Sequence, residues 1–168
     1  MNGADLDGRL AAAGARLASL DHALRAGAPW PLAARFDHSP EATWGPPEIL
    51  AHVEEMLAFW LGEAERIIEG PDERTAFGRV ATDDVRIGII GRDRTLPLRE
   101  LVARVQVGID RWRRRWAELD QASRQRAGTH PSLGVLTVTD VATRFTVGHL
   151  EDHLDQLAAA LGDAPVND

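Results

Sequence analysis

The N-terminal part of the chain carries hydrophobic side chains at alternating steps of four and three positions. They are Leu6, Leu10, Ala13, Leu17, Leu20 and Leu24. This spacing predicts an amphipathic helix with one apolar stripe. Gly27 and Pro29 follow the stripe and predict where the helix ends.

A second stripe lies between two proline-containing segments. Its members are Ile49, Val53, Met56, Trp60, Ala64 and Ile67. Pro46 and Pro47 predict the first turn of this helix, because a proline there gives up no intrahelical hydrogen bond. Gly70 and Pro71 predict its end. Residues 28–45, rich in proline and aromatic side chains, are expected to form the loop before it.

The third stripe is the most regular of the four. It consists of Leu98, Val102, Val105, Ile109, Trp112, Trp116 and Leu119. Such a rhythm is typical of a helix in a bundle. Thr95 predicts the N-cap, with Pro97 just inside the helix.

The last helix is predicted from about Thr137 to Leu161, after a loop formed by residues 120–136. Thr137 and Asp140 have the spacing of a capping box, and Gly162 predicts the stop. Its apolar positions are Val141, Phe145, Leu150, Leu154, Leu157 and Leu161.

Four amphipathic helices whose apolar faces need cover predict an all-α fold, an up-down four-helix bundle. No repeat, low-complexity tract or change in composition marks a boundary, so we expect residues 1–168 to form one domain. The segment 71–95 is left open, because its apolar run 85–90 fits a helical turn, a strand-like piece or a lid.

Composition narrows the classes of function. The chain has no cysteine, so any thiol chemistry requires a thiol from outside the protein. The net charge of −7 argues against a nucleic-acid partner. The first ten residues lack the features of a signal peptide, and no apolar run approaches the ~20 residues of a membrane span. We therefore expect a cytoplasmic protein with no membrane partner.

Three histidines occupy informative positions. His149 and His153 lie one turn apart on one face of the last helix, and His52 lies beside the apolar stripe of the second helix. Imidazoles on a buried face need partners for their nitrogens, and a shared divalent metal would satisfy all three. Three ligands leave coordination positions open for water or substrate. The ligand type suits zinc, nickel, copper or ferrous iron.

Simpler interpretations of these histidines stay open, because histidine pairs are common on exposed helices and a lone core histidine is usually hydrogen-bonded. Among the acidic residues nearby, Asp152 and Glu55 are the candidate catalytic groups, as a base or as hydrogen-bond partners of a ligand histidine. His130 is expected to be a structural hydrogen-bonding group. His22 and His38 are expected at the surface, and the arginines of RWRRRW, 111–116, on solvated helix faces.

Three segments, in this order, resemble the DinB-like superfamily of metal-binding four-helix bundles. They are WGPPEILAHVEEMLAFW with its single histidine, HPSLGVLTV, and the closing VGHLEDHLDQL with its His-x-x-x-His pair. The resemblance extends from about residue 44 to 157. It implies that His52, His149 and His153 form a facial triad on one metal ion.

The same resemblance implies a metal-dependent transferase or isomerase that uses a low-molecular-weight thiol, such as mycothiol or bacillithiol, and a small-molecule electrophile. The metal would be zinc, nickel or iron. A metal-dependent hydrolase, a non-catalytic metal- or ligand-binding stress protein, and a plain helical bundle remain as alternatives. A homodimer is compatible with each of them, because small bundles often bury a leftover apolar face in that way.

Overall fold

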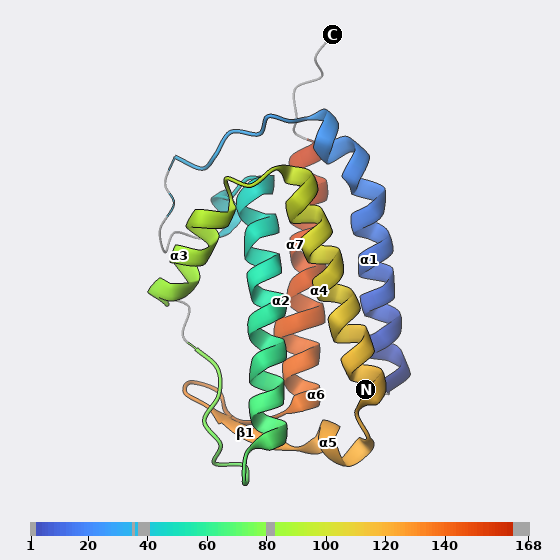
Figure 1. The fold of residues 1–168 in the computed structure, drawn as a ribbon, viewed down its shortest axis with the longest axis vertical. Helices are drawn as coiled ribbons and strands as arrows, with labels where there is room; N and C mark the ends of the chain where they lie inside the picture. The colour runs from blue at the N-terminus through green and yellow to red at the C-terminus, as the bar shows by residue number, and fades with distance from the viewer. Residues whose placement is uncertain (1–2, 35, 37–40, 80–82, 163–168) are drawn as a thin grey trace.

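The computed structural model describes residues 3–34, 36, 41–79 and 83–162 of the chain. The described residues are mainly helical, which confirms the all-α class. Four long helical stretches lie side by side along the long axis of the molecule (Figure 1). They are α1 (Gly3–Ala26), α2 (Pro46–Glu69), α4 (Leu98–Glu118) and a closing stretch composed of α6 (Val138–Asp140), η2 (Val141–Gly148) and α7 (His149–Gly162).

The helices α2 and α4 run in the same direction (Figure 1). Near their C-terminal ends Arg115 forms an ion pair with Glu65, and about two turns earlier the side chain of Leu57 approaches Gly108. The up-down order that the sequence predicts therefore does not hold between these two helices. The reason is that the described residues between α2 and α4, 70–79 and 83–97, return along the length of the molecule before α4 begins.

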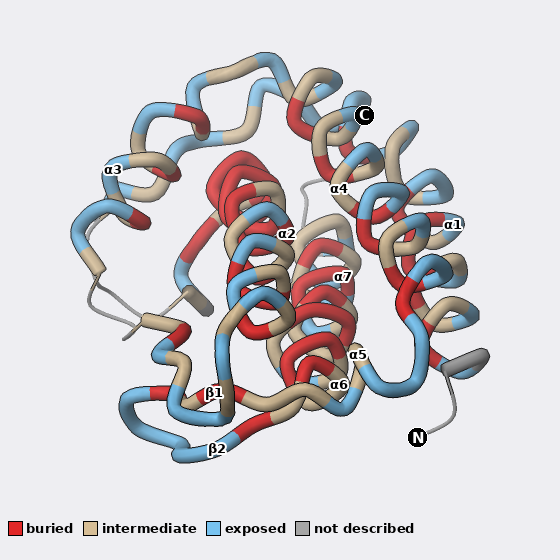
Figure 2. Tube along the Cα trace, turned by 60° about the horizontal axis from the view of Figure 1, so that its bottom comes forward, coloured by how far each residue is buried: buried red, intermediate tan, exposed pale blue. Residues whose placement is uncertain are grey.

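This returning segment, whose structure the sequence left open, contains both extended and helical parts. Ala76 forms a parallel bridge with Thr129, and α3 (Asp84–Asp93) follows. The Asp83 side chain caps α3 by accepting hydrogen bonds from the backbone nitrogens of Val85 and Arg86. Because α3 packs on the outer side of α2, the first half of α2 is buried on almost every side (Figure 2).

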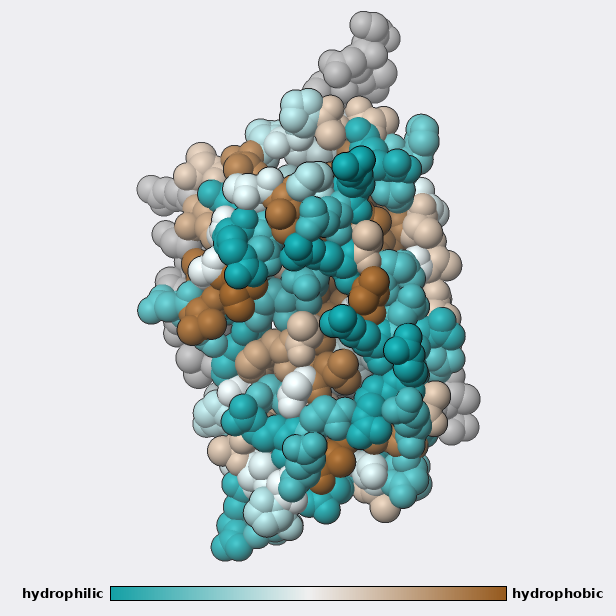
Figure 3. Space-filling view, in the orientation of Figure 1, coloured by the Kyte–Doolittle hydropathy of each residue, from teal (hydrophilic) through white to brown (hydrophobic). Residues whose placement is uncertain are grey.

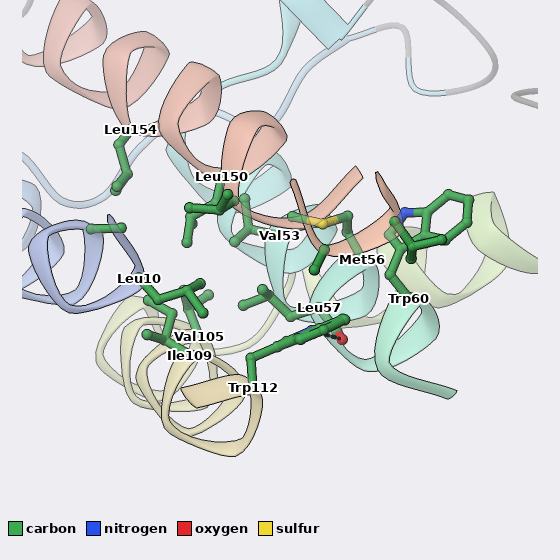
Figure 4. Close-up of a cluster of buried hydrophobic side chains, with 14 of the residues drawn as sticks. Leu10, Val53, Met56, Leu57, Trp60, Val105, Ile109, Trp112, Leu150 and Leu154 are labelled. Atoms are coloured by element: carbon green, nitrogen blue, oxygen red, sulfur yellow. Dashed lines mark hydrogen bonds between the residues drawn. The ribbon is translucent and has the colours of Figure 1, made fainter. Parts of the chain in front are cut away.

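The predicted apolar stripes form the shared core. Figure 4 shows side chains from all four long stretches pointing toward one another: Leu10, Val53, Leu57, Val105, Ile109, Leu150 and Leu154. Trp112 belongs to the same core, and its Nε1 donates a hydrogen bond of 2.9 Å to the carbonyl oxygen of Leu57. On α4 the stripe differs near its start, since Leu101 is fully buried whereas Leu98 and Val102 are only half-buried.

The predicted helix ends are confirmed with one exception. The N-cap of α4 is Pro97, so the expectations of Thr95 as the cap and of Pro97 inside the helix are both wrong. The hydroxyl of Thr95 donates instead to the carbonyl oxygen of Arg92. The capping box of Thr137 and Asp140 is present.

The connection expected to be a loop, 120–136, holds a short helix and a hairpin. These elements are α5 (Gln121–Gln125), β1 (Ala127–His130) and β2 (Gly134–Thr137). The strands pair antiparallel, with Ala127 opposite Thr137 and His130 opposite Gly134. Within the described part of the chain, no helix has both the length and the apolar character needed to span a membrane.

Candidate metal centre

Three elements that are far apart in the sequence bring four ligand-type side chains together. His52 comes from α2, His149 and His153 come from α7, and Glu41 comes from η1 (Glu41–Thr43). One ligand atom from each of the four lies within 4.8 Å of the others. The predicted convergence of the three histidines is confirmed, and the group could hold a metal ion.

The histidine nitrogens face one another and the Glu41 carboxylate. Nε2 of His52 is 3.2 Å from Nε2 of His149. The Glu41 oxygens lie 3.6 Å from Nε2 of His52, 3.6 Å from Nε2 of His149 and 3.5 Å from Nε2 of His153. Imidazole nitrogens together with a carboxylate oxygen are a donor set that suits divalent transition metals.

The hydrogen-bond partners of His153 show which of its two ring nitrogens carries a free lone pair toward the other ligand-type side chains. The amide Nε2 of Gln156 donates to the carbonyl oxygen of Glu41 at 2.7 Å. The amide oxygen of Gln156 is therefore the atom that lies 3.0 Å from Nδ1 of His153, so Nδ1 must carry the proton. Nε2 of His153 then has a free lone pair, and this atom is buried without a hydrogen-bond partner. A metal ion would satisfy it.

The ionisation of the group favours cation binding. Burial alone raises the pKa of the Glu41 carboxyl, but its contact with His149 lowers it. The charge of Arg86 lowers it further, so that the pKa of Glu41 lies well below its usual range. Burial lowers the pKa of His52 and outweighs the opposite effect of Glu41. Glu41 is therefore an anion and His52 is neutral at pH 7, the forms in which both groups bind metals.

A positively charged side chain lies beside the four ligand-type side chains. Arg86, from α3, forms an ion pair with Glu41 through one guanidinium nitrogen. The same nitrogen lies 3.3 Å from Nδ1 and 3.5 Å from Nε2 of His52. This arginine thus occupies the neighbourhood of the ligand atoms.

A cavity of about 290 Å³ opens beside the ligand group. Its lining residues are Glu41, His52, Met56, Trp60, Arg79, Arg86, His130, Phe145 and His149. One wall is aromatic, because the ring of Phe145 is stacked with that of Trp60 at a centroid distance of 4.4 Å and with that of His130 at 5.6 Å. Phe145 belongs to the π-helical stretch η2, a type of helix that is frequent at functional sites.

His130 contributes to the cavity wall and has hydrogen-bond partners of its own. Its Nδ1 accepts from the backbone nitrogen of Ser132 at 3.3 Å. Gly78 lies against the ring with a positive φ of 85°, and a Cβ at this position would approach Cδ2 of His130 to 2.3 Å. Only glycine fits here. Among the described residues, His130 is not a member of the metal-ligand group.

The two predicted catalytic carboxylates lie in different surroundings. Glu55 is buried and forms a two-bond ion pair with Arg79, at 2.5 and 2.6 Å. Asp152 is exposed, in the first turn of α7 between the two ligand histidines. Their catalytic roles stay predictions. His22 is exposed as expected, and His38 lies outside the described residues.

Sequence reasoning missed Glu41, Arg79 and Arg86. Glu41 lies in a segment without periodic hydrophobicity, three residues before Trp44, and Arg79 and Arg86 lie in the segment left open. A spacing pattern contains no signal that these three side chains line one cavity with His52 and His149.

We compared the chain with family models, with curated protein sequences and with solved structures, and no match was found in any of the three.

Proposed function

We propose that the protein is a metal-dependent enzyme that activates a low-molecular-weight thiol and transfers it to a small electrophile. The observation that supports this most is the convergence of three histidine nitrogens and the Glu41 carboxylate beside a cavity large enough for a small ligand. The unpartnered Nε2 of His153 supports a bound ion at this point. The motif resemblance to DinB-like bundles supports the thiol.

In this proposal His52, His149 and His153 hold one divalent ion, of zinc, nickel or iron. When bound, such an ion is a Lewis acid that lowers the pKa of a thiol or of a water molecule next to it. The thiol would come from a cosubstrate such as mycothiol or bacillithiol, because the chain has no cysteine. Glu41 lies close enough to the three histidines either to complete the ligand set or to accept the proton of the thiol.

The rest of the cavity would bind and orient the electrophile. Trp60 and Phe145 provide an apolar wall, and Arg79 and Arg86 provide positive charge. The Arg79 guanidinium is held by Glu55 and lies 3.8 Å from the centre of the Phe59 ring, so its position is well defined. Orientation of two reactants in one cavity is itself a large part of catalysis.

The first experiment is elemental analysis of protein purified without a histidine tag. We expect about one equivalent of metal in the wild type and a loss of that metal in His149→Ala. His22→Ala is the matched control, because it removes an exposed histidine outside the site. Turnover is then screened with several thiols and electrophiles. A metal-free wild type that stays metal-free after reconstitution would refute the proposal.

A second candidate function is metal-dependent hydrolysis. It requires a carboxylate placed to act as a base on water, and Glu41 is such a carboxylate. The two candidates differ in one result: a hydrolase turns over its substrate in the absence of added thiol, whereas a thiol transferase does not. In both cases Glu41→Gln should lower turnover.

A further inference from the structure

A second and larger cavity lies away from the metal centre, in the groove between α2 and α4. Its volume is about 680 Å³, and it shares no lining residue with the cavity beside the ligand group. Figure 3 shows the corresponding face, with apolar atoms gathered near its middle and hydrophilic atoms around them. This groove is an exposed, partly apolar surface that the proposed function does not use.

Small side chains on both helices produce the hollow. Ala58 and Gly62 line it from α2, and Ala103 and Gly108 line it from α4. A Cβ at Gly62 would meet no atom within 4 Å, so this position opens into free space. Val107 projects into the groove with 48% of its surface exposed. An exposed apolar hollow of this kind is typical of an interaction site.

The unpaired charges that line the groove differ in sign between its two ends. Most of the other charges are neutralised within the groove, since Arg104 pairs with Glu100 and Arg115 pairs with Glu65. Three charges make no ion pair with any described residue. They are Glu54 near one end of the groove, and Arg111 and Arg114 near the other.

These three charges are placed almost symmetrically about the apolar centre. The apolar centre of the groove lies at Leu57 of α2 and Gly108 of α4, because the side chain of Leu57 lies next to Gly108. Because α2 and α4 run in the same direction, Glu54, about one turn before Leu57, and Arg111, about one turn after Gly108, lie on opposite sides of this centre. Arg114 lies about one turn further.

We propose that this groove is the interface of a homodimer with a two-fold axis through its apolar centre. A two-fold rotation places the Arg111 and Arg114 end of one copy opposite the Glu54 end of the other, so the surface is complementary to itself. The Val107 side chains of the two copies then meet near the axis and exclude water. The metal cavity of each copy stays open, because it lies outside the groove.

Two sets of variants test the interface by sedimentation and native mass spectrometry of the full chain. Val107→Glu places a carboxylate near the axis, and R111E/R114E places like charges opposite Glu54. Each should raise the dimer dissociation constant by about 100-fold or more, because like charges facing each other across an interface are strongly unfavourable. Val85→Glu is the matched control, since Val85 is 69% exposed on α3 outside the groove. Circular dichroism confirms that each variant is folded.

A charge exchange makes the test specific for the proposed pairing. Glu54→Arg and R111E/R114E should each be monomeric alone, and a mixture of the two should form a heterodimer. A wild type that is monomeric at all accessible concentrations would overturn the proposal, even if the groove bound a small amphipathic anion instead. A dimer that survives Val107→Glu and R111E/R114E would overturn it as well. None of these outcomes depends on metal content or turnover.

Discussion

Arg86 shares its ion-pair partner Glu41 with the three histidines, and its guanidinium lies 3.3 Å from Nδ1 of His52. A side-chain cation therefore occupies the same neighbourhood as any metal ion that the group holds. Two cations at such a separation repel each other strongly in a buried site, even with partial screening. Metal binding should thus require that Arg86 gives up Glu41 and moves into the adjoining cavity.

We predict that Arg86→Gln binds divalent metal more tightly than the wild type. Removing the positive charge and freeing Glu41 should lower the metal dissociation constant by about tenfold or more. Competition with a chromophoric chelator at fixed pH measures this change directly.

Arg79→Gln is the control for this prediction. Arg79 lines the same cavity, but its guanidinium is paired with Glu55 rather than with the ligand group. Its substitution should therefore leave metal affinity nearly unchanged. If Arg86→Gln instead weakened metal binding, Arg86 would be a supporting partner of Glu41 and not a competitor.

The positions of His52, His149 and His153 show what periodicity can predict about a site. The i, i+4 relation of His149 and His153 follows from helix geometry, and the apolar neighbours of His52 indicate the face of α2 that turns inward. Glu41 belongs to η1, a single turn between loops, and no repeat in the sequence relates it to the helices. Its place depends on contacts with distant elements, such as the hydrogen bond that its carbonyl oxygen accepts from Gln156 of α7.

In the fold, too, some features follow from the hydrophobic period and others do not. Long stripes such as the one from Leu98 to Leu119 predict their helix well, because many residues report the same period. The strands β1 and β2 have only four residues each, too few for a periodic signal. The parallel arrangement of α2 and α4 is reached through the path of residues 70–79 and 83–97, which the hydrophobic pattern does not predict.

The lowered pKa of His52 predicts a pH dependence of stability in the metal-free protein. Burial keeps His52 neutral in the folded state, whereas in the unfolded chain its pKa returns to about 6.5. Below that pH the unfolded state then binds more protons than the folded state. The contribution of neutral His52 to the free energy of unfolding is therefore complete above about pH 6.5 and is lost as the pH falls. Thermal unfolding between pH 5 and 8, with chelator present, measures the slope.

His52→Gln should make this slope smaller, because the substituted side chain does not titrate. Burial lowers the pKa of His130 as well, so part of the slope should remain. His22→Gln, at an exposed position, should leave the slope as in the wild type. An identical pH dependence in His52→Gln and wild type would show that His52 does not control acid stability.

Glu55 and Asp152, the two predicted catalytic carboxylates, should respond differently to neutralisation. Asp152→Asn changes an exposed residue and should alter the free energy of unfolding by no more than about 0.5 kcal/mol. Glu55→Gln removes the buried partner of Arg79 and should cost about 3 kcal/mol. Urea denaturation measures both. A loss of turnover in Asp152→Asn with unchanged metal content would then identify Asp152 as a catalytic group.

The fully buried carboxylate of Glu48, which lies on α2 about one turn before His52, predicts a large effect on stability. One of its oxygens accepts from the backbone nitrogen of Ala33 at 2.8 Å and from Arg94 at 3.0 Å. Arg94→Met leaves this charge buried without a counter-ion and should cost about 3 kcal/mol in urea denaturation. Arg99→Met, which removes an exposed arginine of α4 that pairs with no described residue, should cost much less. The double variant E48M/R94M should recover most of the loss, because no unpaired charge then remains. A double variant as unstable as Arg94→Met would show instead that Glu48 stabilises the loop chiefly through its hydrogen bond to Ala33.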